Sequence, residues 1–168
     1  MSAPVTAYVG LGANLYEPIA QLQLAFTELD ALAETRVTAR SPLYKSAPLG
    51  PHEQPDYINA VACLETRLTP LALLAGLHAI ENNHGRRRDG ERWGPRTLDL
   101  DLLLYGDLSV TSPALTLPHP GLRERAFVLY PLTDIAADLI IPGGGSVQVL
   151  RDALADPRIG RLEDDRHA

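Results

Sequence analysis

Residues 57–80 read YINAVACLETRLTPLALLAGLHAI, a strand followed by a helix. Apolar and β-branched residues dominate residues 57–65, a composition typical of a buried strand. Thr69 can cap a helix, and Pro70 suits its first turn. The apolar positions that follow are three or four residues apart, as on one face of a helix, and they are Leu73, Leu74, Leu77 and Ile80.

The segments on both sides extend this stretch into an α+β fold. Residues 6–11 and 37–44 are predicted strands, with a helix from Pro18 between them, and Pro42 indicates an edge or a bulge in the second strand. Residues 98–105 form a fourth predicted strand. The order β-α-β-β-α-β is that of a ferredoxin-like split βαβ sandwich, with two helices on one face of a mainly antiparallel sheet.

A C-terminal extension is expected to follow this sandwich. We predict a short strand at 108–110, an irregular stretch at 113–120 and a turn at 143–145. Short helices are expected after Leu122 and over 147–155. Residues 158–168 are polar and are expected to form a flexible tail.

Length and composition favour one compact domain. The 168 residues are 45% hydrophobic and 21% charged, which predicts a single domain over 1–168. Apolar runs are too short to span a bilayer and no signal peptide is evident. A single cysteine excludes an intramolecular disulfide and agrees with a cytoplasmic protein.

The charge is distributed unevenly. The net charge of −6 argues against a nucleic-acid or membrane binder, but the segment from Arg86 to Arg96 has five arginines and two acids. Such a cationic loop on an acidic protein indicates a small, highly charged anion, and the guanidinium fork suits phosphate. For Arg86, Arg87 and Arg88, a solvated charge run is the simpler interpretation.

The strongest local signal is the pair Asp99 and Asp101. Side chains alternate along a strand, so both carboxylates should leave the same face, with Cα atoms about 6.6 Å apart. Their repulsion of about 2–3 kcal/mol at an effective dielectric near 20 would be removed by a divalent cation. Oxygen ligands favour Mg²⁺, although an acidic exposed strand face would also explain the pair.

Other candidates are weaker in isolation. Tyr57 and Asn59 share a strand face and could stack on and hydrogen-bond a heteroaromatic ring, or simply pack. His119 lies between two prolines, where a structural role is common. His78 and Glu81 are one helical turn apart, and an ordinary exposed helix face is the favoured interpretation.

A longer motif resembles a known family. Residues 92–102, RWGPRTLDLDL, resemble the signature of the 6-hydroxymethyl-7,8-dihydropterin pyrophosphokinase family. Further matches are YVGLGANL at 8–15, PLGP at 48–51, QPDYINA at 54–60, PHP at 118–120 and RAFVL at 125–129. The resemblance covers roughly residues 6–142 and implies a ferredoxin-like fold.

The activity implied by this resemblance is transfer of pyrophosphate from ATP to the hydroxymethyl group of the reduced pterin, with release of AMP, in folate biosynthesis. Asp99 and Asp101 would hold two Mg²⁺ ions, and Arg86 and Arg96 would join them as catalytic residues. The implied ATP-binding residues are Glu81, Arg86, Arg88, Trp93, Arg96, Leu102, His119 and Arg125. The implied pterin-binding residues are Ser46, Ala47, Pro48, Leu49, Tyr57, Asn59, Trp93, Asp99 and Phe127.

Residues 45–56 and 85–97 are expected to be lids that close on bound ATP. The protein should act as a monomer on these small molecules, without a nucleic-acid or membrane partner. Two other classes stay open on the residues alone. A two-metal phosphohydrolase could use the same acids and arginines, and an RNA-binding module could use the same fold.

Overall fold

The computed structural model describes residues 3–14, 17–46, 56–84, 98–154 and 159–162. The main sheet contains β1 (Val5–Ala13), β2 (Thr35–Arg40), β3 (Tyr44–Ser46), β4 (Tyr57–Thr66), β5 (Asp99–Tyr105) and β10 (Ile159–Arg161). Two small hairpins are formed by β6 (Val110–Thr111) with β7 (Thr116–Leu117), and by β8 (Ile140–Ile141) with β9 (Gly145–Ser146). The helices are α1 (Pro18–Asp30), α2 (Pro70–Asn83), the short 3-10 helix η1 (Leu122–Glu124), α3 (Ala126–Ile135) and α4 (Val147–Ala153).

The sheet has the order β10-β3-β4-β1-β5, and every pair in it is antiparallel. Strands β2 and β3 pair with β4 one after the other, β2 with residues 62–66 and β3 with residues 57–59. The sheet therefore has β5 at one edge, with β4 and β1 at its centre. This arrangement confirms the predicted α+β ferredoxin-like class.

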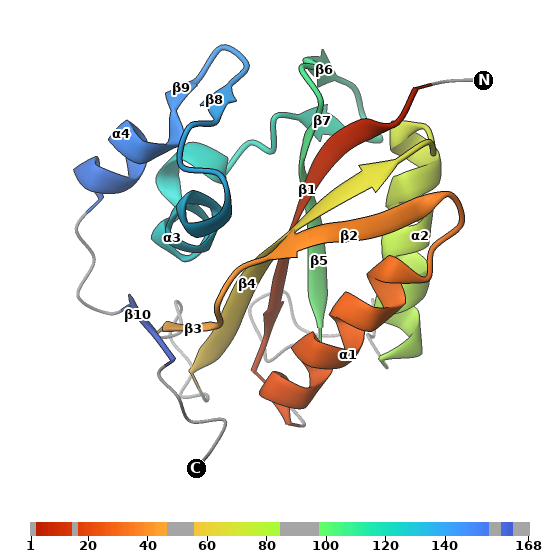
Figure 1. Cartoon of the computed structure of the whole chain (residues 1–168), viewed down its shortest axis with the longest axis horizontal. Coiled ribbons are helices and arrows are strands. Elements are labelled where there is room, and N and C mark those ends of the chain that lie inside the picture. The colour runs from red at the N-terminus through yellow and green to blue at the C-terminus, as the bar shows by residue number, and fades with distance from the viewer. Residues whose placement is uncertain (1–2, 15–16, 47–55, 85–97, 155–158, 163–168) are drawn as a thin grey trace.

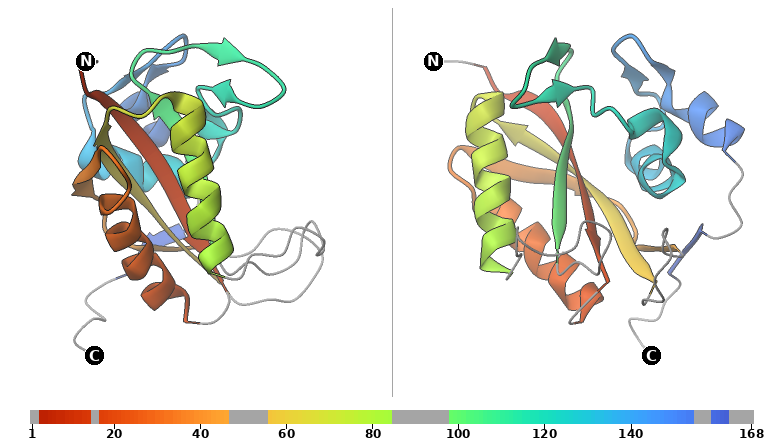
Figure 2. Two further views of the ribbon diagram at one scale, coloured as in Figure 1. Left: turned by 90° about the vertical axis from the view of Figure 1, so that its right-hand side faces the viewer. Right: turned by 180° about the vertical axis from the view of Figure 1, so that it is seen from behind.

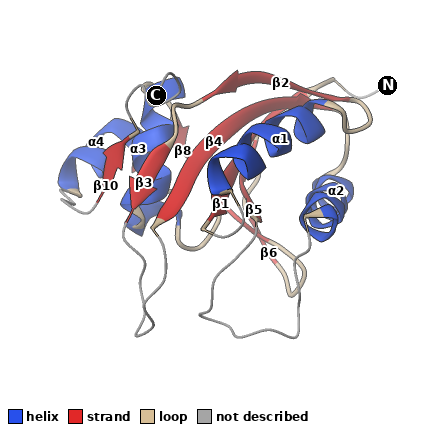
Figure 3. Cartoon of the chain, turned by 90° about the horizontal axis from the view of Figure 1, so that it is seen from below, coloured by secondary structure: helices blue, strands red, loops and turns tan. Residues whose placement is uncertain are grey.

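Helices cover both faces of the sheet. Figures 1 and 3 show α1 and α2 on one side, and Figure 2 shows α3 and α4 on the other. Between the sheet and α1 and α2 lies a core that includes Leu22, Leu29, Leu73 and Leu77, all fully buried. A second core on the opposite face packs Val61, Leu103 and Leu104 of the sheet against Val128 and Leu132 of α3.

The predicted starts of α1 and α2 are confirmed, whereas the helix predicted over 147–155 ends at Ala153. Thr69 caps α2 by accepting a hydrogen bond from the backbone N–H of Ala72 (3.2 Å), and Pro70 is the first helical residue. Pro18 likewise begins α1. These signals are local, so they could be read directly from the sequence.

The second predicted strand is divided in two. Strand β2 ends at Arg40 and β3 begins at Tyr44, with Ser41 and Pro42 between them. The backbone N–H of Ser41 donates to the Val61 carbonyl, and its side-chain oxygen accepts from the Val61 N–H (both 2.9 Å). Through these two hydrogen bonds Ser41 attaches the segment between β2 and β3 to β4. This segment includes Pro42, which indicated an edge or a bulge.

The C-terminal segment differs most from the prediction. The expected flexible tail is wrong for Ile159–Arg161, which form β10 and pair with β3. The stretch 113–120 is not wholly irregular, because Thr116 and Leu117 form β7. The predicted turn at 143–145 is present between β8 and β9, where Gly143 has a φ of 68°. In the described part of the chain, no helix is long and apolar enough to cross a membrane.

Candidate active site

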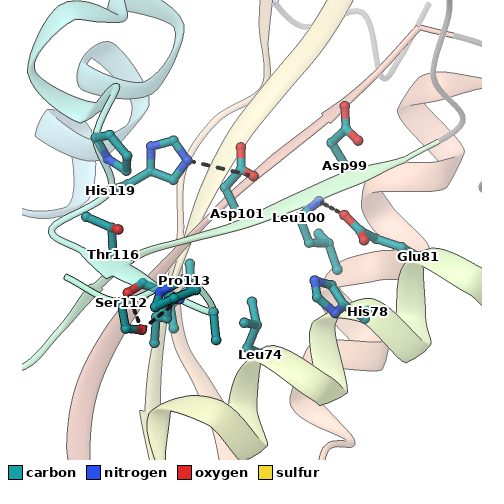
Figure 4. Close-up of a pocket in the computed structure, with 14 residues that line it drawn as sticks. Leu74, His78, Glu81, Asp99, Leu100, Asp101, Ser112, Pro113, Thr116 and His119 are labelled. Carbon is teal, nitrogen blue, oxygen red and sulfur yellow. Dashed lines mark hydrogen bonds and ion pairs between the residues drawn. The ribbon is translucent and has the colours of Figure 1, made fainter. Parts of the chain in front are cut away.

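A cavity of about 500 Å³ opens at the β5 edge of the sheet (Figure 4). Strand β5 contributes residues 99–102, and α2 contributes Leu74, His78 and Glu81. The wall opposite α2 comes from residues 112–116 of the β6–β7 hairpin, together with His119 and Pro120. The cavity therefore joins residues from three separate segments of the chain.

Asp99 and Asp101 leave β5 on the same side and are partly exposed, as the alternation predicted. Leu100 and Leu102, on the other side, are each 3% exposed and belong to the core under α2. Among the described residues, no group of three or more His, Cys, Asp or Glu side chains could hold a metal ion. Two carboxylates nevertheless fit Mg²⁺, which is commonly held by one or two carboxylates and completes its shell with substrate phosphates and water.

His119 faces Asp101 across the cavity (Figure 4). Its Nδ1 accepts a hydrogen bond from the Gly121 N–H (3.1 Å), so the neutral ring carries its proton on Nε2, which lies 4.0 Å from Asp101 Oδ1. Burial lowers the pKa of His119 below 6.5 and outweighs Asp101, which raises it, while Arg125 lowers it further. His119 is therefore neutral at pH 7 and presents an N–H donor to the cavity.

Glu81 is buried, so the exposed helix face expected for it is wrong. It is 4% exposed, and its Oε2 accepts a hydrogen bond from the backbone N–H of Leu100 (2.7 Å). Among the described residues β5 is an edge strand, and Glu81 supplies the acceptor that a further strand would otherwise provide. Glu81 thus ties α2 to β5 between the two aspartates.

A second group of predicted residues lies on β3 and β4. Ser46 and Asn59 are each 6% exposed, and the Ser46 hydroxyl donates to Asn59 Oδ1 (2.8 Å). Tyr57 pairs with Ser46 across the two strands. The bond from Ser46 directs the amide nitrogen of Asn59 away from the serine, where it can donate to a ligand.

Asn59 and Asp99 lie in one row across the sheet, with Gly12 between them. Gly12 pairs with Asn59 on β4 and with Asp99 on β5. Strands are about 4.8 Å apart, so the two polar residues flank Gly12 at about 10 Å from each other. A Cβ on Gly12 would lie 3.0 Å from Asn59 Nδ2. The absence of a side chain here leaves room beside the amide, a role that the sequence analysis missed.

The remaining predicted residues fall into three sets. Arg125 and Phe127 lie where α3 begins, with the Arg125 guanidinium 5.8 Å from the Phe127 ring centre. Leu102 lines the cavity. Outside the described residues lie Ala47, Pro48, Leu49, Arg86, Arg88, Trp93 and Arg96, together with most of the two predicted lids.

The cavity wall at residues 112–116 was not predicted. Ser112, Pro113 and Thr116 line it, although the sequence showed only a proline-rich irregular stretch there. The hairpin that carries them is held by reciprocal backbone hydrogen bonds between Ser112 and Leu115. No periodicity in the sequence indicates such a turn, which explains why these residues were missed.

Paired carboxylates at a sheet edge beside a cavity are typical of an α+β enzyme, and the comparisons with known proteins agree. The family model "7,8-dihydro-6-hydroxymethylpterin-pyrophosphokinase" matches residues 8–137. The 2-amino-4-hydroxy-6-hydroxymethyldihydropteridine pyrophosphokinase of Pseudomonas aeruginosa is 52% identical over 155 residues, covering 92% of this chain and 95% of the relative. The enzyme of the same name from Haemophilus influenzae is 47% identical over 158 residues, covering 94% and 98%.

Solved structures show the same fold. A crystal structure of an HPPK-DHPS in complex with substrates superposes with a TM-score of 0.76 at 10% identity. That match covers 96% of this chain and 47% of the solved one, so this chain corresponds to about half of the solved protein.

The chain belongs to the 7,8-dihydro-6-hydroxymethylpterin-pyrophosphokinase family. It is an ATP-dependent pyrophosphokinase of folate biosynthesis, and its substrates are ATP and the hydroxymethyldihydropterin. This assignment decides against the phosphohydrolase and the RNA-binding module that the residues alone left open.

Proposed function

We propose that Asp99 and Asp101 hold two Mg²⁺ ions against the triphosphate of ATP, and that the pterin binds beside Asn59 and Gly12. The observation that carries this proposal is the placement of both carboxylates on one side of β5, facing a cavity of about 500 Å³. Bound Mg²⁺ would neutralise phosphate charge and orient the transferred group. Transfer of this kind depends on alignment and charge neutralisation rather than on a covalent enzyme intermediate.

The ATP side of the site is formed by residues around this cavity. His119 presents its Nε2–H as a neutral donor to a phosphate or ribose oxygen, and Leu102 offers an apolar wall. Glu81 holds β5 in place through Leu100, and Arg125 adds positive charge near His119. Arg86, Arg88, Trp93 and Arg96 complete the proposed ATP contacts.

The pterin side is supported by the hydrogen bond from Ser46 to Asn59. This bond orients the Asn59 amide so that its nitrogen can donate to the polar edge of the ring. Tyr57 and Phe127 supply aromatic surface for stacking. Because Asn59 and Asp99 share one row across Gly12, the hydroxymethyl group of a pterin held there could reach the triphosphate. Ala47, Pro48, Leu49 and Trp93 belong to the same proposed set.

Several broader expectations belong to the proposal. Residues 1–168 form a single domain that acts as a monomer in the cytoplasm and binds neither nucleic acid nor membrane. Segments 45–56 and 85–97 close over bound ATP. Hydrogen exchange with and without Mg²⁺ and a non-hydrolysable ATP analogue tests this closure, and equal protection in both states would contradict it.

The metal assignment is tested by Asp99→Asn and Asp101→Asn. Each should lower turnover by at least about 10³-fold with the fold retained, because the neutral amide is a weaker ligand and removes one charge from the site. AMP formation from ATP and the pterin is measured over a Mg²⁺ titration, with circular dichroism as the check of folding.

Asp107→Asn provides a matched control, since Asp107 is an exposed acid just beyond the end of β5. It should leave turnover and the Mg²⁺ dependence unchanged. Near-normal turnover in either Asp99→Asn or Asp101→Asn would refute the metal assignment.

A further inference from the structure

Strand β10 lies against β3, the strand that carries Ser46. Ile159 pairs with Ser46, Gly160 with Lys45 and Arg161 with Tyr44. Directly beyond the strand, the Leu162 N–H donates to the Leu43 carbonyl (2.8 Å). Every residue of β3 therefore has one partner on β4 and another on β10.

Polar and aromatic contacts with α3 anchor this C-terminal segment. Asp134 of α3 accepts a hydrogen bond from the Tyr44 hydroxyl and forms an ion pair with Arg161 (3.2 Å). Tyr44 is 4% exposed, and burial raises the pKa of its hydroxyl, with the Asp134 contact acting in the same direction. Upstream of β10, the Tyr130 hydroxyl of α3 donates to the Leu154 carbonyl (2.6 Å).

These contacts converge on the proposed pterin site. Strand β3 is only three residues long, and so short a strand is held weakly by one neighbour. It ends at Ser46, whose hydroxyl orients the Asn59 amide. Tyr44 pairs directly with Asn59, so Arg161, Tyr44, Asn59, Gly12 and Asp99 form one continuous row across five strands.

We infer that β10 is a positioning element for pterin recognition, with Arg161 and Tyr44 as positioning residues that act through Ser46 on Asn59. The inference rests on the proposed placement of the pterin beside Asn59. The ATP cavity lies at β5, the edge opposite β10 in the strand order. Loss of the β10 contacts should therefore weaken pterin binding and leave ATP binding unchanged.

The test compares Arg161→Ala, Tyr44→Phe and a chain ending at Arg158. Pterin affinity is measured in the presence of Mg²⁺ and a non-hydrolysable ATP analogue, and the affinity for the analogue is measured separately. Each substitution removes a hydrogen bond or ion pair and should weaken pterin binding by about three- to tenfold, and the shortened chain by more. Arg161→Lys, which keeps the charge, should recover part of the affinity.

Arg36→Ala is the matched control. Arg36 pairs with Glu65 (2.8 Å) between β2 and the far end of β4, and its side chain is exposed like that of Arg161. This variant should bind the pterin normally. If the shortened chain does not fold, the pterin affinities of Arg161→Ala and Tyr44→Phe still test the inference.

Asn59→Ala separates this inference from the proposed function. If Asn59→Ala weakens pterin binding but the Arg161, Tyr44 and shortened variants bind it normally, the inference is wrong and the proposed pterin site stands. Equal losses for pterin and nucleotide in the Arg161 and Tyr44 variants would also overturn the inference. Normal pterin binding by Asn59→Ala would overturn both the proposed site and the inference.

Discussion

Tyr8 is a titrating group that links stability to pH outside the active site. It lies on β1 opposite Cys63 of β4, and burial raises its pKa from 10.0 to about 12, with Cys63 acting in the same direction. A raised pKa means that the folded protein holds this proton more tightly than the unfolded chain. The stabilisation is therefore fully present below pH 10 and is lost as the pH rises toward about 12.

We expect the free energy of unfolding to fall over this pH window. In Tyr8→Phe the free energy of unfolding should fall less steeply with pH, because the substitution removes the titrating hydroxyl. Urea unfolding at a series of alkaline pH values measures both slopes. Tyr44, whose pKa is also raised, contributes to the same trend in both proteins and so cancels in the comparison. Parallel curves for the wild type and Tyr8→Phe would contradict the assignment.

At the scale of elements, α2 and β5 are coupled through one buried carboxylate. Glu81→Ala would leave the N–H of Leu100 without its acceptor at a residue that is 3% exposed. Such a loss costs about 1–3 kcal/mol, so the variant should unfold at lower urea concentration. Glu65→Ala is the control, because its exposed pair with Arg36 should contribute less than about 1 kcal/mol. Equal losses in the two variants would show that Glu81 does not hold β5.

Some of the helices and strands could be predicted from sequence patterns, and others could not. The helix signals at Thr69 and Pro70, and the alternation around Asp99 and Asp101, were confirmed because each depends on neighbouring residues. The pairing of β10 was missed because a three-residue segment, Ile-Gly-Arg, is too short to show a recognisable period. Its position depends on Asp134 and on β3, which are distant in the chain.

At the scale of the whole molecule, one sheet joins two cores. Leu77 of α2 and Leu132 of α3 are fully buried on opposite faces of it. Because β4 and β5 contribute side chains to both cores, damage to either core should destabilise the whole protein. Leu77→Ala and Leu132→Ala should each lower the free energy of unfolding by about 2–5 kcal/mol and leave a single transition.

Urea unfolding followed by circular dichroism and by tyrosine fluorescence provides the measurement. Leu71→Ala is the control on the same helix as Leu77, since Leu71 is 57% exposed and its loss should change stability by less than about 0.5 kcal/mol. Two separated transitions in either core variant would contradict the expectation of one domain.

The fold class, the common face of Asp99 and Asp101, and the family could all be predicted from the amino-acid sequence, because strand alternation, helix spacing and a contiguous motif are properties of adjacent residues. The folded structure was needed to show that Glu81 is buried against Leu100, that Ser46 orients Asn59, and that β10 closes the sheet beside β3. Each of these contacts joins residues from different elements. Their formation depends on how the elements pack, and no local period in the chain specifies that packing.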